Sequence, residues 1–252
     1  MRILLTNDDG INSEGIYALY KELRKIGEVH VVAPDVERSA VGHAITLSDP
    51  LRVTEVFKEG AFYGYAVSGT PADCVKIAVM KLLKKKPDVV FSGINLGPNV
   101  GISVLYSGTV CGATEGAILG IPSVAVSLAK YKDADFSYAA QFARGLALKV
   151  KKNCLKNPIL LNVNVPGIPK NMIKGVRVAR QGIDGFVESY EKRIDPRERI
   201  YYWLTGDKIK IKGNPNVDVT ALRKGYITIT PIQYDMTNYA VMKELASWKI
   251  KR

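Results

Sequence analysis

The chain has 252 residues, of which 47% are apolar and 24% are charged. These values are ordinary for a globular protein with a sizeable core, and the length suits one large domain or one domain with an appendage. No apolar run approaches the ~20 residues that span a bilayer, and no signal peptide is evident, so we expect a cytoplasmic protein with no membrane partner. The net charge of +12 favours anionic ligands such as nucleotides, although the lysines are spread as on solvated faces.

The cysteine and histidine content limits the metal chemistry. Cys74, Cys111 and Cys154 are far apart and odd in number, which argues against a disulfide framework or a zinc ribbon and favours buried thiols. His30 and His43 are too few for a histidine-based cluster. Any bound metal must therefore use oxygen ligands, which indicates Mg²⁺, Mn²⁺ or Ca²⁺.

Strand-like and helix-like segments alternate through the first two thirds of the chain. A strand is predicted at 2–6, followed by a helix at 14–25 in which Ile16, Leu19 and Leu23 recur at helical spacing. A Gly- and Asn-rich loop is predicted at 92–107. The other elements predicted here are strands at 28–33, 51–56, 61–67, 89–91, 122–126 and 159–163, and helices at 71–84, 109–119 and 136–151.

This alternation predicts a three-layer α/β/α Rossmann-like fold with a mostly parallel sheet. We expect residues 1–170 to form the α/β core and residues 171–252 to form a β-rich extension. The extension would hold an aromatic β-hairpin, a return strand at 225–230 and a final helix from residue 238. A segment of this kind either packs on its own domain or is exchanged with another subunit.

Two carboxylates follow the first predicted strand directly. The segment runs from Ile3 into Asn7, Asp8, Asp9 and Gly10. Ligands of open α/β sheets bind beyond the carboxyl ends of the strands, where adjacent carboxylates would repel unless a cation or a shared proton offset them. The segment therefore indicates half of a hard-metal site or a carboxylate pair for acid–base work, with a local turn as the alternative.

Further polar loops follow the later strands. Arg38, Ser39 and His43 come after the second strand, and Asn95 and Asn99 lie in the predicted loop at 92–107. Right-handed crossovers place such loops on one edge of a sheet, so we expect them to converge with the two aspartates.

The turn Ser107, Gly108 and Thr109 precedes a predicted helix. It offers hydroxyl groups and free backbone N–H groups at the positive end of the helix dipole, an arrangement that binds phosphate. A simple helix N-cap explains it equally well, as it does the similar turn at 68–70.

Taken together, these motifs resemble the SurE family of stationary-phase survival proteins, which are divalent-metal-dependent nucleoside 5′/3′-monophosphate phosphatases. The motifs occur in the family's order over about residues 2–130, and the similarity continues through 161–166 and 225–231. The matching segments are Thr6-Asn7-Asp8-Asp9-Gly10, Ala33-Pro34-Asp35 with Arg38-Ser39-Ala40 and Gly42-His43, Ser68 to Val75, Ser92-Gly93-Ile94-Asn95 with Gly97-Pro98-Asn99, and Tyr106 to Val110. Cys111 stands where the family usually has a small residue.

The resemblance implies one divalent ion per subunit, most readily Mg²⁺ or Mn²⁺. The positions that match its metal ligands are Asp8, Asp9, Ser39 and Asn95. Those that match phosphate- and substrate-binding positions are Arg38, Asn99, Ser107, Gly108 and Thr109. Catalysis would fall to Asp8, Asp9 and Asn95, with Asp9 as our choice for proton handling.

The resemblance also implies the substrates and the assembly. We expect hydrolysis of nucleoside 5′- and 3′-monophosphates to nucleoside and phosphate, with short polyphosphate or nucleic acid only as secondary substrates. We expect a homodimer or homotetramer in which C-terminal segments, including about 176–203, are exchanged.

Three other classes of protein share single features with this chain. A covalent aspartyl phosphatase also begins with an aspartate after its first strand, but its two aspartates are separated by one residue. A signalling receiver domain places paired acids there, but is about half this length. A basic nucleic-acid-binding protein would show steep salt dependence of binding without turnover.

Overall fold

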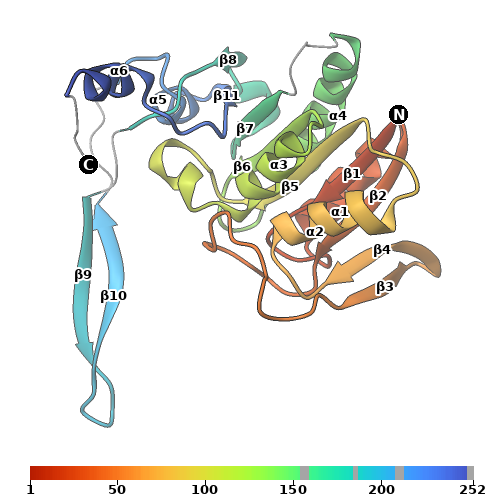
Figure 1. Ribbon diagram of the computed structural model, residues 1–252, viewed down its shortest axis with the longest axis horizontal. Helices are drawn as coiled ribbons and strands as arrows, with labels where there is room; N and C mark the ends of the chain where they lie inside the picture. The colour runs from red at the N-terminus through yellow and green to blue at the C-terminus, as the bar shows by residue number, and fades with distance from the viewer. Residues whose placement is uncertain (154–158, 184–186, 208–212, 249–252) are drawn as a thin grey trace.

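The computed structural model describes residues 1–153, 159–183, 187–207 and 213–248 (Figure 1). Its strands are β1 (Arg2–Thr6), β2 (Glu28–Pro34), β3 (Val53–Lys58), β4 (Ala61–Val67), β5 (Val89–Leu96), β6 (Ser123–Ala129), β7 (Leu160–Pro166), β8 (Val176–Val178), β9 (Val187–Ile194), β10 (Ile200–Asp207) and β11 (Ile227–Ile232). Its α-helices are α1 (Glu14–Leu23), α2 (Pro71–Ile77), α3 (Gly108–Ile118), α4 (Ser137–Lys152), α5 (Asp218–Arg223) and α6 (Tyr239–Ser247).

Within the described residues, all strands except β9 and β10 form one sheet in the order β3-β4-β2-β1-β5-β6-β7-β11-β8. The pairs from β4 through β7 are parallel, whereas β3 runs antiparallel to β4 and β11 runs antiparallel to β7. This arrangement confirms the predicted mostly parallel α/β sheet. The carboxyl ends of β1, β2, β5 and β6 consequently lie on one edge.

Helices cover both faces of this sheet. Successive side chains of a strand point to opposite faces, so apolar residues of the same strand pack in two different clusters. Ile3 and Leu5 of β1 pack in one cluster with α1 and α4, to which α1 contributes Ile16. Leu4 faces the opposite way and packs with α2 through Val75. A third cluster joins α3 to β6 and β7. The helical spacing recognised in the sequence thus marks the buried side of α1.

Two predicted boundaries are wrong. Strand β5 does not end at residue 91 but continues to Leu96, because its polar residues Ser92 and Asn95 pair with Ala125 and Ser127 of β6. The composition of that stretch suggested a loop, yet a neighbouring strand satisfies its backbone. The helix predicted at 71–84 is α-helical only to Ile77 and continues as a π-helical segment.

The C-terminal part divides between the sheet and a separate hairpin. Strands β8 and β11 extend the main sheet, whereas β9 and β10 pair only with each other and project away from it (Figure 1). The hairpin exposes Tyr190, Tyr202 and Trp203. The domain boundary near residue 170 and the exchange between subunits stay predictions. Of the final predicted helix, residues 249–252 lie outside the described residues.

Two further expectations concern the thiols and the membrane. Cys74 and Cys111 are buried and free, as predicted, and Cys154 lies outside the described residues. In the part of the chain that the structure describes, every helix is too short or too polar to cross a bilayer.

Candidate functional site

The turn after β1 presents the two aspartates. Asn7 is fully buried, and its side-chain amide donates hydrogen bonds to the Gly10 carbonyl at 2.9 Å and to Ser13 Oγ at 2.8 Å. Gly10 adopts a φ of +90°, which favours glycine. Asn7 therefore connects the end of β1 to the start of α1 and fixes the direction of Asp8 and Asp9.

A cavity of about 390 Å³ opens at this edge of the sheet. It brings together six of the residues predicted from the sequence: Asp8, Asp9, Ser39, Asn95, Asn99 and Ser107. Its lining also includes residues to which no individual role was assigned: Glu37, Ala40, Leu96, Ser103 and Tyr106. Glu37 could have been predicted from the sequence, because it is an acidic residue between Asp35 and Arg38 in a loop already assigned to the site.

Gly108 and Thr109, although described, lie outside that lining and instead contact Asp8. Asp8 is only 4% exposed, and Thr109 Oγ1 donates a hydrogen bond to its Oδ1. A Cβ on Gly108 would lie 2.7 Å from Asp8 Cβ and 2.9 Å from its Oδ2. The start of α3 thus positions this carboxylate in two ways. Thr109 donates a hydrogen bond to it, and Gly108, which has no side chain, allows Asp8 to pack closely against the helix.

Ser107 serves the helix and the cavity at once. Its Oγ accepts a hydrogen bond from the Val110 N–H at 3.1 Å, so Ser107 is the N-cap of α3. The same residue lines the cavity. The two interpretations of this turn are therefore compatible, because a capping oxygen keeps its own O–H as a donor.

Arg38 contacts the site residue Asp8 through its backbone. Its N–H donates to the Asp8 carbonyl at 2.7 Å. Its guanidinium Nη2 lies 3.4 Å from the Ser68 carbonyl and 3.7 Å from Asp35 Oδ1. In the described structure Arg38 is not part of the cavity lining, so its role in substrate binding stays a prediction.

Ser39 and Asn95 bring oxygen donors to the cavity. Ser39 Oγ donates to Glu37 Oε1 at 2.6 Å. Asn95 Nδ2 donates to the Gly97 carbonyl at 2.8 Å, which leaves the amide Oδ1 as the acceptor of that side chain. Both side chains thus have an oxygen with lone pairs suited to a hard cation.

Burial disfavours the charged form of both aspartates. Desolvation raises the pKa of Asp8, and Thr109 opposes this by hydrogen bonding. Desolvation, followed by the charge of Asp8, raises the pKa of Asp9 to about 7. Two neighbouring carboxylates that resist ionisation in a polar cavity fit a site completed by a cation.

The side chains available as ligands also limit which metal ion the site can bind. Among the described residues, no group of three or more His, Cys, Asp or Glu side chains is arranged to hold a metal ion. The predicted set has only two carboxylates and is completed by a hydroxyl and an amide. Such all-oxygen ligands fit Mg²⁺ or Mn²⁺, which retain water ligands, better than Zn²⁺.

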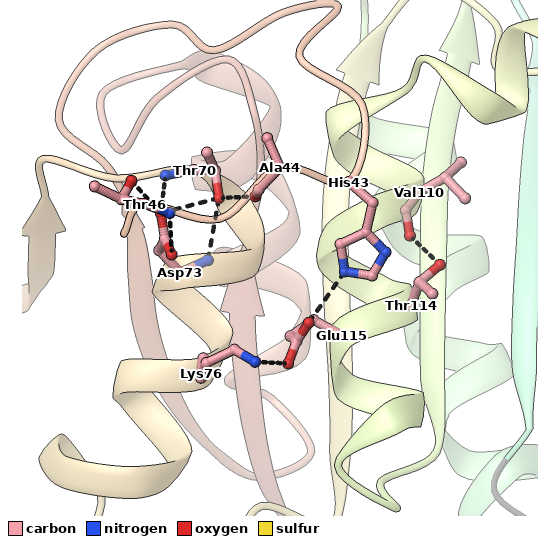
Figure 2. Close-up of polar contacts among 9 residues, drawn as sticks. All are labelled: His43, Ala44, Thr46, Thr70, Asp73, Lys76, Val110, Thr114 and Glu115. Atoms are coloured by element: carbon pink, nitrogen blue, oxygen red, sulfur yellow. Dashed lines mark hydrogen bonds and ion pairs between the residues drawn. The ribbon is translucent and has the colours of Figure 1, made fainter. Parts of the chain in front are cut away.

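The loop that carries Ser39 is anchored on two helices (Figure 2). His43 Nε2 lies 3.0 Å from Glu115 Oε2 of α3, and Lys76 Nζ of α2 lies 2.9 Å from Glu115 Oε1. Glu115 is only 3% exposed on its side chain. Burial alone would raise its pKa, but the hydrogen bonds and charges of His43 and Lys76 outweigh burial and lower it.

A second anchor lies farther along the same loop. The Asp73 carboxylate accepts hydrogen bonds from the Thr46 N–H at 3.1 Å, from Thr46 Oγ1 at 2.7 Å and from the Thr70 N–H at 3.0 Å (Figure 2). Thr70 Oγ1 in turn donates to the Ala44 carbonyl at 2.7 Å. The turn at 68–70 is therefore a capping box that also fixes the loop, rather than a phosphate site.

Asn99 is positioned by side chains of β6 and β7. Its N–H donates to Asn164 Oδ1 at 2.8 Å, and its carbonyl accepts from Asn162 Nδ2 at 2.7 Å and Asn164 Nδ2 at 2.9 Å. Its own amide donates to Ser127 Oγ at 2.9 Å. This role of Asn162 and Asn164 was not predicted, although two polar residues on one face of a buried strand were a signal.

The comparisons with known proteins agree over nearly the whole chain. The family model described as "Survival protein SurE" matches residues 3–188. The 5′-nucleotidase SurE of Syntrophus aciditrophicus (strain SB) is 55% identical over 246 residues, which are 97% of this chain and 92% of that protein. The 5′-nucleotidase SurE of Syntrophobacter fumaroxidans (strain DSM 10017 / MPOB) is 51% identical over 250 residues, 99% of this chain and 100% of that protein.

A solved structure extends the agreement to the fold. The crystal structure of the SurE protein from Aquifex aeolicus superposes with a TM-score of 0.87 at 41% sequence identity, covering 98% of this chain and 99% of that one. On these matches, and with the motifs gathered at one edge of the sheet, the chain belongs to the SurE family.

Proposed function

We propose that this protein is a divalent-metal-dependent nucleotidase that hydrolyses nucleoside 5′- and 3′-monophosphates. The relatives named 5′-nucleotidase support the nucleotide substrate. The observation that carries the metal dependence is the pair of neighbouring carboxylates, Asp8 and Asp9, at one cavity with Ser39 and Asn95. Mononucleotides are the principal substrates in this proposal, and short polyphosphate is a secondary one.

Asp8, Asp9, Ser39 and Asn95 would hold one Mg²⁺ or Mn²⁺ ion. When bound, such an ion lowers the pKa of a water ligand and offsets charge on the phosphoryl group. The ion fits the site because it would compensate two carboxylates that burial otherwise drives toward their neutral forms.

The protein side chains supply position. Thr109 and Gly108 fix Asp8, so this carboxylate does not need to reorganise during the reaction. The Ser107 hydroxyl and the Asn99 side chain line the cavity and would hold phosphate oxygens. Asp9 is less buried than Asp8 and has no side-chain partner comparable to Thr109, so we assign proton transfer to its carboxylate.

We further propose a homodimer or homotetramer built through the C-terminal part. The support is the projecting β9–β10 hairpin, which exposes several large apolar side chains. Light scattering of the full chain and of a Trp203→Lys variant tests this assembly. A wild-type monomer would contradict it.

The function is tested by phosphate release from 5′- and 3′-nucleoside monophosphates after chelation and again after Mg²⁺ or Mn²⁺ is restored. We expect release only with metal, and none from Asp8→Ala, which should keep its circular dichroism spectrum. Asp49→Ala, which removes an exposed aspartate, is the matched control and should be fully active. An active Asp8→Ala variant would refute the metal site.

A further inference from the structure

A second groove adjoins the catalytic cavity. It has a volume of about 700 Å³ and shares Asp9, Glu37 and Leu96 with that cavity. Its far wall is formed by the start of α1 and by the segment between β6 and α4, which contributes Tyr131 and Phe136. A molecule whose phosphate lies in the first cavity can therefore extend past Asp9 and Leu96 into the second.

The groove offers a flat aromatic surface to such a molecule. Tyr131 is 69% exposed, although its ring lies against the backbone at Gly97. A Cβ at Gly97 would lie 2.9 Å from Tyr131 Cε1, so the ring occupies space that only glycine leaves open. Leu96, 42% exposed, adds an apolar surface between the two cavities.

The position of Tyr131 is connected to a predicted metal ligand. The Gly97 carbonyl accepts the hydrogen bond from Asn95 Nδ2, and the Gly97 N–H donates to the Leu128 carbonyl at 2.9 Å. The aromatic ring and the Asn95 side chain thus contact the same residue. Their separation is set by strand β5 and its partner β6 rather than by a free loop.

The charge of the groove defines what part of a substrate it accepts. Apart from Asp9, whose charge the proposed ion would compensate, its lining holds the carboxylates of Glu14, Glu37 and Asp133 against the single ammonium of Lys132. An additional phosphate would be repelled there, whereas an uncharged group with N–H and O–H donors would be accepted. An aromatic ring beside such acceptors suits a base and its ribose.

We infer that this groove binds the nucleoside of the substrate and that Tyr131 stacks on its base. This inference rests on the proposed nucleotidase function and assigns it a specificity residue. It also predicts a preference for monophosphates, because a longer phosphate chain between the reacting phosphate and the nucleoside would lie among the carboxylates. Tyr106, 58% exposed on the rim of the catalytic cavity, is the competing position for the base.

The test compares substrates with and without a base. KM and kcat are measured with metal for 5′-AMP and for glycerol 3-phosphate in the wild type and in Tyr131→Ala, Tyr131→Phe and Tyr106→Ala. Because stacking of a base on an aromatic side chain is worth ~1–3 kcal/mol, Tyr131→Ala should raise KM for 5′-AMP about fivefold or more. KM for glycerol 3-phosphate should stay within about twofold, and Tyr131→Phe should resemble the wild type.

The control and the contrary outcomes separate this inference from the function on which it rests. Phe57→Ala removes an aromatic ring that is exposed at the opposite end of the sheet, and it should change neither substrate. Equal effects of Tyr131→Ala on both substrates, or a base-dependent effect only in Tyr106→Ala, would overturn the assignment. If the folded wild type hydrolyses neither substrate with metal, the proposed function itself fails.

Discussion

Substitution of Gly108 tests whether the start of α3 fixes Asp8, the aspartate to which we assign a catalytic role. The Cβ of an alanine would lie 2.7 Å from Asp8 Cβ, whereas ordinary contact begins at 3.4 Å, so one of the two must retreat by roughly 0.7 Å. A displacement of about 1 Å in a reacting group lowers the rate about 100-fold. We therefore expect Gly108→Ala to lose about two orders of magnitude in kcat with 5′-AMP and Mg²⁺.

The same substitution should change stability much less. Crowding in a packed region costs about 1–3 kcal/mol, and an alanine in a helix recovers up to about 1 kcal/mol. The free energy of unfolding in urea should thus fall by at most about 3 kcal/mol. Gly145→Ala is the matched control, because a Cβ there meets nothing within 4 Å in the middle of α4. It should raise stability by about 0.5–1 kcal/mol and leave kcat unchanged. A Gly108→Ala variant with wild-type kcat would show that Asp8 does not need this close contact.

Three further predictions concern the residues that hold the site loops. Burial raises the pKa of Asp73, but the hydrogen bonds from Thr46 and Thr70 outweigh it and leave the pKa below the usual value. The stability that the Asp73 carboxylate contributes should therefore be present above about pH 4 and be lost as the pH falls through its folded-state pKa. In urea melts at pH 7, Asp73→Ala should lower the free energy of unfolding by about 2–4 kcal/mol, and this difference should shrink in acid. Glu115→Ala leaves His43 and Lys76 without their buried partner and should cost about 2–3 kcal/mol, whereas a loss below about 0.5 kcal/mol would mean that this ion pair does not secure the loop. Asp218 accepts hydrogen bonds from the Gly101 and Gly182 N–H groups, both at 2.9 Å, so Asp218→Ala should lower both the melting temperature and kcat, and an unchanged kcat would separate this contact from the site.

Much of the fold could be predicted because local and tertiary preferences agree. The helix of Ile16 and Leu19 buries the face that its spacing indicates, and Thr70 and Pro71 start α2 as a cap and a first-turn proline do. Strand β5 was predicted too short because its Gly and Asn residues favour a loop locally. Only the register with β6, which depends on residues more than thirty positions away, keeps them in a strand.

The candidate site likewise contains residues that could be predicted from the sequence and residues that could not. Asp8, Asp9 and Asn95 could be found because each lies near the end of an apolar strand, and strand ends converge. The polar pair Asn162 and Asn164 marked one face of β7 in the sequence, but its contact with Asn99 could not be predicted, since that contact depends on which strand neighbours β6. The direction of the Arg38 guanidinium, toward Ser68 and Asp35, likewise depends on packing between loops.

The hydrogen bonds around Asn99 have a consequence for how the protein matures. Every side chain that lines the candidate cavity belongs to residues 8–107, but the Asn99 backbone is held by β7, and Gly101 is held by Asp218. A chain emerging from the ribosome presents its N-terminal residues first. A nascent chain that ends before β7 therefore contains the whole cavity lining and lacks the partners of the Asn99 backbone. Under the proposed function, competence for phosphate binding should appear only once β7 has been made.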